Sequence, residues 1–174
     1  MSTEAFRGTF HQKVDSKARV SIPAALRRKL DLEDPVTADA PKTRIVMVYG
    51  GKTRNFVECY TIAGAEALAA EVDAMPMGSK DRLRAERDLI MLSATVEIDD
   101  DGRIVLPPPV REKMGFLGDD LEKGGMASFA GVSNRIKLYR YEVLEAELEA
   151  LENAEQEDDY VDPLARVSKY KTGR

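Results

Sequence analysis

A short stretch near the N-terminus combines residue types that suit nucleic-acid binding. Lys13, Lys17 and Arg19 are three cations within seven residues, and Arg7 precedes them. Lysine ammonium groups bind phosphate oxygens as point charges, whereas an arginine guanidinium can bind phosphates or guanine edges through paired donors. This chemistry needs no nucleophile, base or metal. The stretch therefore predicts a surface that contacts double-stranded DNA.

Residues from which an active site could be built are sparse. His11 is the only histidine and Cys59 the only cysteine. We expect His11 to be a solvated or packed strand residue and Cys59 to pack as a small hydrophobic side chain. The run 99–101 is three aspartates, but it lacks the further spaced oxygen ligands of a calcium loop. The sequence therefore predicts no enzyme, no metal site and no cofactor.

The basic stretch belongs to a motif that occurs twice, 84 residues apart. Charged, proline and apolar positions match at this single offset, which indicates a duplicated unit. The matched pairs are Val14/Ile98, Asp15/Asp99, Arg19/Arg103, Val20/Ile104, Ile22/Leu106, Pro23/Pro107, Leu26/Val110, Arg27/Arg111 and Leu30/Met114.

The shared polar residues are expected to build a turn and the helix after it. Asp15 and Arg19 flank one turn and have the spacing to form an ion pair across it, and the second copy repeats this spacing. A proline suits the first turn of a helix, and cations suit its last turn. For Arg27 and its basic neighbours, a solvated helix end and a DNA contact both stay open. The structural motif comprises Asp15, Pro23, Arg27, Asp99, Gly102, Arg103 and Arg111.

The two copies differ in charge. Glu97 and Asp101 stand in the second copy where the first has Lys13 and Lys17. Charge is also segregated along the chain: ten acidic and no basic residues lie in 142–162, and four basic and no acidic residues follow. The net charge of −5 is therefore no argument against a nucleic-acid partner, because the basic face belongs to the first copy alone.

Hydrophobic periodicity predicts an α+β chain. The first copy is expected to form a hairpin of strands 7–14 and 19–22 with Lys17 at its tip, followed by a helix that begins at Pro23. The second copy is expected to form strands 95–98 and 103–106 and a short helix closed by a glycine. The other expected elements are strands 44–49, 55–60, 126–130 and 135–139, and helices 63–75, 79–92 and 142–153; residues 163–174 are expected to be poorly ordered.

The motif residues resemble the MraZ family from about residue 6 to residue 153. One departure is Ala18, which stands where the family turn prefers glycine; at positive φ an alanine there costs on the order of 1 kcal/mol. The resemblance rests on three motifs: Arg7-Gly8, the Asp15-x-Lys17-x-Arg19 turn with Pro23 and Arg27, and the Asp99-x-x-Gly102-Arg103 turn.

The resemblance implies a fold that is mainly β with helices. Two tandem AbrB-like units of the swapped-hairpin type would form a pseudo-symmetric β-barrel, flanked by amphipathic helices. The expected division is a first AbrB-like half over 6–61, a helical connector over 62–92, a second half over 93–140, a C-terminal helix over 141–154 and a flexible tail over 155–174.

The resemblance also implies a function. The chain would be a sequence-specific DNA-binding transcriptional regulator of the division and cell-wall gene cluster, cytoplasmic and associated with the nucleoid rather than with a membrane. A ring-shaped homo-oligomer, octamer-like, would bind short direct repeats in promoters through Arg7, Lys13, Lys17 and Arg19. The alternative is a protein-interaction or assembly module whose ring and acidic helix recruit a partner, and preference for duplex DNA or for a protein would discriminate the two.

Overall fold

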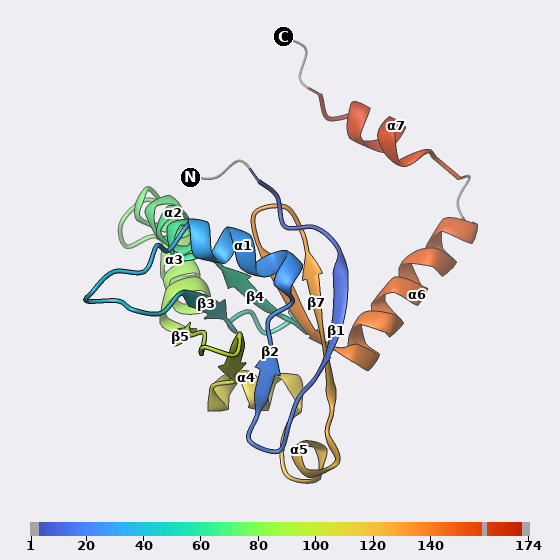
Figure 1. Cartoon of the computed structure of the whole chain (residues 1–174). Coiled ribbons are helices and arrows are strands. Elements are labelled where there is room, and N and C mark those ends of the chain that lie inside the picture. Colours follow the sequence, from blue (N-terminus) through green and yellow to red (C-terminus); the bar gives the residue numbers. More distant parts are fainter. Residues whose placement is uncertain (1–3, 158–159, 172–174) are drawn as a thin grey trace. The chain divides into compact units, whose positions relative to one another are not determined.

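The computed structural model describes residues 4–157 and 160–171, and it divides into two compact units, Met1–Tyr141 and Glu142–Arg174. The described chain is α+β with antiparallel strands, as expected (Figure 1). The strands are β1 (Thr9–Lys13), β2 (Arg19–Ser21), β3 (Arg44–Val48), β4 (Val57–Tyr60), β5 (Ser93–Glu97), β6 (Arg103–Val105), β7 (Met126–Gly131) and β8 (Ile136–Arg140). The helices are α1 (Ala24–Leu32), α2 (Ile62–Asp73), α3 (Lys80–Ala85), the π-helix η1 (Glu86–Met91), α4 (Pro108–Met114), α5 (Asp119–Lys123), α6 (Tyr141–Glu157) and α7 (Pro163–Ser168).

The strands form two sheets that interleave the two copies of the repeat. The larger sheet has the order β1-β7-β8-β4-β3-β5, and the smaller one pairs β2 with β6. Each copy thus lends its first strand to the hairpin of the other, since β1 pairs with β7 and β5 pairs with β3. No ladder among the described residues joins the edge strands β1 and β5, so the closed barrel stays a prediction.

The predicted hairpin of residues 7–14 with 19–22 is wrong. β1 pairs along its whole length with β7, and β2 pairs with β6. The two segments are joined only at the turn, where the Asp15 N–H donates to the Arg19 carbonyl at 3.0 Å. Alternation of polar and apolar residues predicts a strand but not its partner, which the burial of distant segments selects.

Strand register reflects the duplication directly. Val20 lies opposite Ile104, its own counterpart at the offset of 84. Glu58 likewise lies opposite Lys137, at the offset of 79 that relates β4 to β8. A residue that faces its own counterpart lies on a pseudo-twofold axis. This axis passes through both sheets of the first unit.

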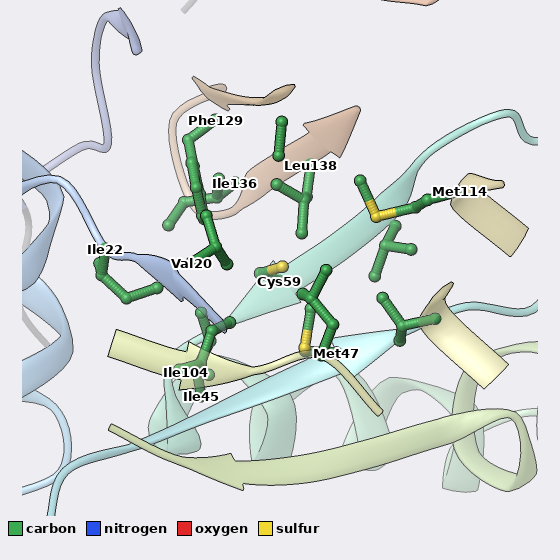
Figure 2. Close-up of a cluster of buried hydrophobic side chains, with 14 of the residues drawn as sticks. Val20, Ile22, Ile45, Met47, Cys59, Ile104, Met114, Phe129, Ile136 and Leu138 are labelled. Atoms are coloured by element: carbon green, nitrogen blue, oxygen red, sulfur yellow. The ribbon is translucent and has the colours of Figure 1, made fainter. Parts of the chain in front are cut away.

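The core is built from the apolar positions that the two copies share. Val20, Ile22 and Ile104 gather with Met47 and Cys59 of the large sheet (Figure 2). Burial of each such side chain contributes roughly 1.5–3 kcal/mol. All ten shared apolar residues are at most 6% exposed: Val14, Val20, Ile22, Leu26, Leu30, Ile98, Ile104, Leu106, Val110 and Met114.

Most of the helices follow the predicted pattern. α1 starts one residue after Pro23, and Gly115 closes α4 with a φ of +75°. Lys29 takes neither of the two roles left open for it, a solvated helix end or a DNA contact. It is buried, and its Nζ donates to the Glu4 carbonyl at 2.6 Å. The predicted helix 79–92 begins at its Ser79 cap as expected but continues as the π-helix η1. α5 was not predicted, and α7 lies in the segment 163–174 that was expected to be poorly ordered.

Candidate nucleic-acid interface

The turn between β1 and β2 is built around one carboxylate. Asp15 Oδ1 accepts the backbone N–H groups of Lys17 and Arg19, each at 2.9 Å. Asp15 Oδ2 accepts a hydrogen bond from Arg19 Nε at 2.7 Å. Burial raises the pKa of Asp15, but these hydrogen bonds outweigh it and hold the pKa below its ordinary value. The carboxylate is therefore charged at neutral pH and fixes both the loop and the arginine.

This arrangement leaves the cations of the turn facing solvent. Only Nε of Arg19 is used, so both terminal nitrogens are without a hydrogen-bond partner among the described residues. Lys13 and Lys17 are exposed. The turn thus presents a guanidinium fork oriented by Asp15 together with two exposed ammonium groups, a set of donors that suits phosphate oxygens and base edges.

The turn between β5 and β6 has the same backbone hydrogen bonds as the first turn but different exposed side chains. Asp99 Oδ1 accepts hydrogen bonds from the backbone N–H groups of Asp101 and Arg103, each at 2.9 Å. The bond from the Arg103 N–H is the main cause that lowers the pKa of Asp99. Here Arg103 Nη2 donates to Asp101 Oδ2 at 3.0 Å. The carboxylate at the position of Lys17 therefore engages a nitrogen that the first turn leaves free.

The second half contributes to the surroundings of the first turn. The Val14 N–H donates to the Gly125 carbonyl at 2.8 Å, which places the start of β7 beside the turn. Lys13 lies across Gly124, where an added Cβ would come within 2.7 Å of Lys13 Cε. Lys123, which precedes Gly124, is exposed. Sequence reasoning missed Lys123 because nothing local predicts that β7 lies next to β1.

The remaining predicted residues lie apart from this cluster. Arg7 is exposed but precedes β1 at its opposite end, about 20 Å of strand from Lys13. Arg27 Nε donates to Asp31 within α1 at 3.2 Å, whereas its counterpart Arg111 donates to the Leu106 carbonyl at 2.7 Å. Arg27 is thus engaged within its own helix, and Arg111 ties α4 to the end of the strand before it. Of the predicted residues, Lys13, Lys17 and Arg19 lie at or next to the turn between β1 and β2.

Other polar groups are engaged internally. A cavity of about 440 Å³ is lined by Glu58, whose carboxylate accepts from Tyr60 at 2.6 Å and pairs with Arg54 and Arg135. Cys59 is fully buried, which raises the pKa of its thiol to about 12. In the described ranges no three His, Cys, Asp or Glu side chains are grouped to hold a metal ion, and none of the helices is long and apolar enough to cross a bilayer.

Comparison with known proteins places the chain among regulators of transcription. It is 46% identical over 149 residues to the transcriptional regulator MraZ of Cereibacter sphaeroides, covering 86% of this chain and 88% of the relative. It is 42% identical over 161 residues to the protein of the same name from Ruegeria sp., covering 91% and 92%. No family model matches. The chain belongs to the MraZ family.

Proposed function

We propose that the chain is a DNA-binding transcriptional regulator whose first turn contacts double-stranded DNA. The observation that supports this best is the state of Arg19: Asp15 orients its guanidinium through Nε and leaves both terminal nitrogens available. Lys13 and Lys17 flank it, and the names of the relatives agree with the role. Arg7, at the far end of β1, would support binding to an adjacent phosphate.

The contacts divide into two kinds. The fork of Arg19 matches the O6 and N7 acceptors of guanine in the major groove, a pairing worth about 1–3 kcal/mol of discrimination. Lys13 and Lys17 bind phosphates and supply affinity without sequence information. Binding releases counterions and therefore weakens steeply as salt rises.

One turn is a small contact surface, so affinity must come from repetition. We extend the proposal to a ring-shaped homo-oligomer that presents several first turns to short direct repeats in a promoter, because linked sites raise the effective concentration of each next contact. The family resemblance supports the division and cell-wall gene cluster as the target. Short direct repeats in the DNA just upstream of this gene would support this target.

The decisive comparison is between the two repeat arginines. We expect Arg19→Ala to weaken duplex binding at least about tenfold in a gel-shift titration, the loss of one bidentate contact. Arg103→Ala should leave binding within about twofold, because Arg103 is engaged by Asp101. Melting temperature and oligomer size serve as controls for folding. Equal loss of DNA affinity in both variants, with native melting temperatures, would refute the assignment to the first turn.

A protein-interaction module is the second candidate. α6 exposes Leu148 and Leu151 among glutamates, and such a face can bind a basic partner. Under this alternative the intact protein binds a protein ligand, and Arg19→Ala changes nothing in duplex DNA retention. Parallel retention measurements on immobilised duplex DNA and on candidate proteins separate the two functions.

A further inference from the structure

The C-terminal unit contains two helices that each leave apolar side chains uncovered. On α6, Leu148 is 49% and Leu151 is 58% exposed. On α7, Leu164 is 77% and Val167 is 59% exposed, and Tyr170 just beyond is 86% exposed. A six-residue helix is far below the length that is stable alone in water. α7 therefore needs a surface to pack on.

The uncovered residues lie on one face of each helix. Leu148 and Leu151 continue a stripe that begins at the buried Leu144, with spacings of four and three residues. Leu164 and Val167 are three residues apart, and helical neighbours at three or four residues share a face. Each stripe is narrow and matches the width of a single partner helix.

The charges beside the two stripes are opposite. Glu145, Glu152 and Glu155 are exposed around the α6 stripe and form no ion pair within the described residues. Arg166 and Lys169 are exposed beside the α7 stripe. A second copy of α6 would bring glutamates against glutamates. DNA would accept the cations of α7 but would leave the leucines of α6 in water.

The connection between the helices fits an antiparallel pair. Five residues, 158–162, separate α6 from α7, which is within the usual range for two antiparallel helices joined in a hairpin. α7 has a defined start, because Asp162 Oδ1 accepts the Leu164 N–H at 2.9 Å ahead of a proline in the first turn. A connection this short gives the two helices a high effective concentration for each other, well above that of a second chain.

We propose that α7 packs antiparallel on the Leu148/Leu151 stripe of α6 in the same chain. Apolar contact between the stripes and pairing of Arg166 and Lys169 with the flanking glutamates hold the two helices together. The pairing neutralises the cations of α7, so they do not belong to the DNA surface. The inference stands independently of the DNA-binding proposal, because it concerns only the second unit.

Disulfide trapping in the full chain tests the contact. Leu151 lies nine residues before residue 160 and Tyr170 ten residues after it, so an antiparallel pair turned about that point brings them close together. The variant Leu151→Cys/Tyr170→Cys should form an intrachain disulfide at least about tenfold faster than Asn153→Cys/Tyr170→Cys, whose first cysteine is on the opposite side of α6. The native Cys59 is buried and takes no part.

A charge-reversal pair tests the polar part of the contact. Added to the trapping variant, Lys169→Glu should slow disulfide formation several-fold, and Glu152→Lys should restore it. Equal rates in the trapping and control variants would overturn the proposal. So would disulfides that link two chains, which assign the stripe to a second copy, or trapping that duplex DNA suppresses, which assigns α7 to DNA. None of these outcomes depends on the gel-shift behaviour of Arg19→Ala.

Discussion

Position 18 holds an alanine in a conformation that alanine rarely adopts. Ala18 has a φ of +60°, and its counterpart Gly102 has a φ of +78°. The left-handed region costs a residue with a Cβ about 1–2 kcal/mol. The turn tolerates this because two hydrogen bonds from Lys17 and Arg19 to Asp15 hold the loop in one shape. Ala18 departs from the glycine that the family prefers, but the hydrogen-bonded shape of the turn is kept.

A substitution at the second turn should reveal the free-energy cost of a Cβ at positive φ. Gly102→Ala is expected to lower the free energy of unfolding by about 1–2 kcal/mol, because the added Cβ is strained at positive φ and comes within 3.2 Å of Arg27 Nη1. Urea unfolding followed by circular dichroism measures it. Ala18→Gly is the matched control: relief of strain is offset by the loss of a buried methyl group and a more flexible unfolded chain, so a change below about 1 kcal/mol is expected. A cost for Ala18→Gly as large as that for Gly102→Ala would contradict this account.

An ion pair between a buried carboxylate and a partly exposed arginine should make stability depend on pH. Asp34 is 6% exposed, and Arg44 donates to it from its backbone N–H, Nε and Nη2 at 2.8, 3.0 and 2.7 Å. The side-chain hydrogen bonds of Arg44 outweigh burial and lower the pKa of Asp34 from its ordinary value of 3.8. Because the folded pKa lies below the unfolded one, the stabilisation is complete above pH 3.8 and is lost as pH falls through the folded pKa.

Asp34→Asn isolates this contribution. The variant should be about 2 kcal/mol less stable at pH 7, since hydrogen bonds to a charged group contribute roughly 1.5–3 kcal/mol. It should also lose less of its remaining stability than the parent protein on acidification below pH 4. Urea unfolding at a series of pH values gives both numbers. Parallel pH profiles for the two proteins would contradict the assignment.

At the scale of elements, η1 packs directly on the backbone of the β3–β4 connection. A Cβ added to Gly50 would come within 2.0 Å of the Asp88 carbonyl oxygen, a contact that only a backbone shift can relieve. Gly50→Ala should therefore destabilise the chain by about 2 kcal/mol or more. Gly78→Ala is the control, because its Cβ would meet nothing within 4 Å and only its positive φ costs energy, about 1 kcal/mol. Thermal melts in which the two variants behave alike would contradict this packing.

What the sequence predicts depends on how local each feature is. Alternation and proline or glycine signals placed most strands, the start of α1 near Pro23 and the end of α4 at Gly115 within a few residues. The turn at Asp15 could also be predicted from the sequence, because its hydrogen bonds join residues within five positions of each other. The pairing of β1 with β7 was not, since the partner is more than 100 residues away. The burial of Lys29 also depends on a segment distant in sequence, because its Nζ donates to the carbonyl of Glu4.

The first unit combines a symmetric frame with an asymmetric surface. Val20 opposite Ile104 and Glu58 opposite Lys137 mark the pseudo-twofold axis, and both turns use the same aspartate and arginine. The turns differ in the charges outside that frame and in the residue at positive φ, which is Ala18 in the first turn and Gly102 in the second. The same frame therefore accommodates cations on one turn and carboxylates on the other, because exposed charges contribute little to folding. Each chain then offers one basic turn, which is consistent with a need for several copies on DNA.

Exchange of one charge between the turns tests this division of roles across the whole molecule. The double variant Lys17→Asp/Asp101→Lys keeps the net charge at −5. Its free energy of unfolding should stay within about 1 kcal/mol of the parent, because both side chains are exposed. Duplex affinity should fall at least about tenfold, since a carboxylate then lies beside Arg19 while Glu97 keeps the second turn acidic. The slope of log affinity against log salt should also decrease in size by about one per chain in contact with DNA. Unchanged affinity in a gel shift with the parent's stability would mean that binding does not depend on which turn bears the lysine, and the first turn would lose its assignment as the DNA contact.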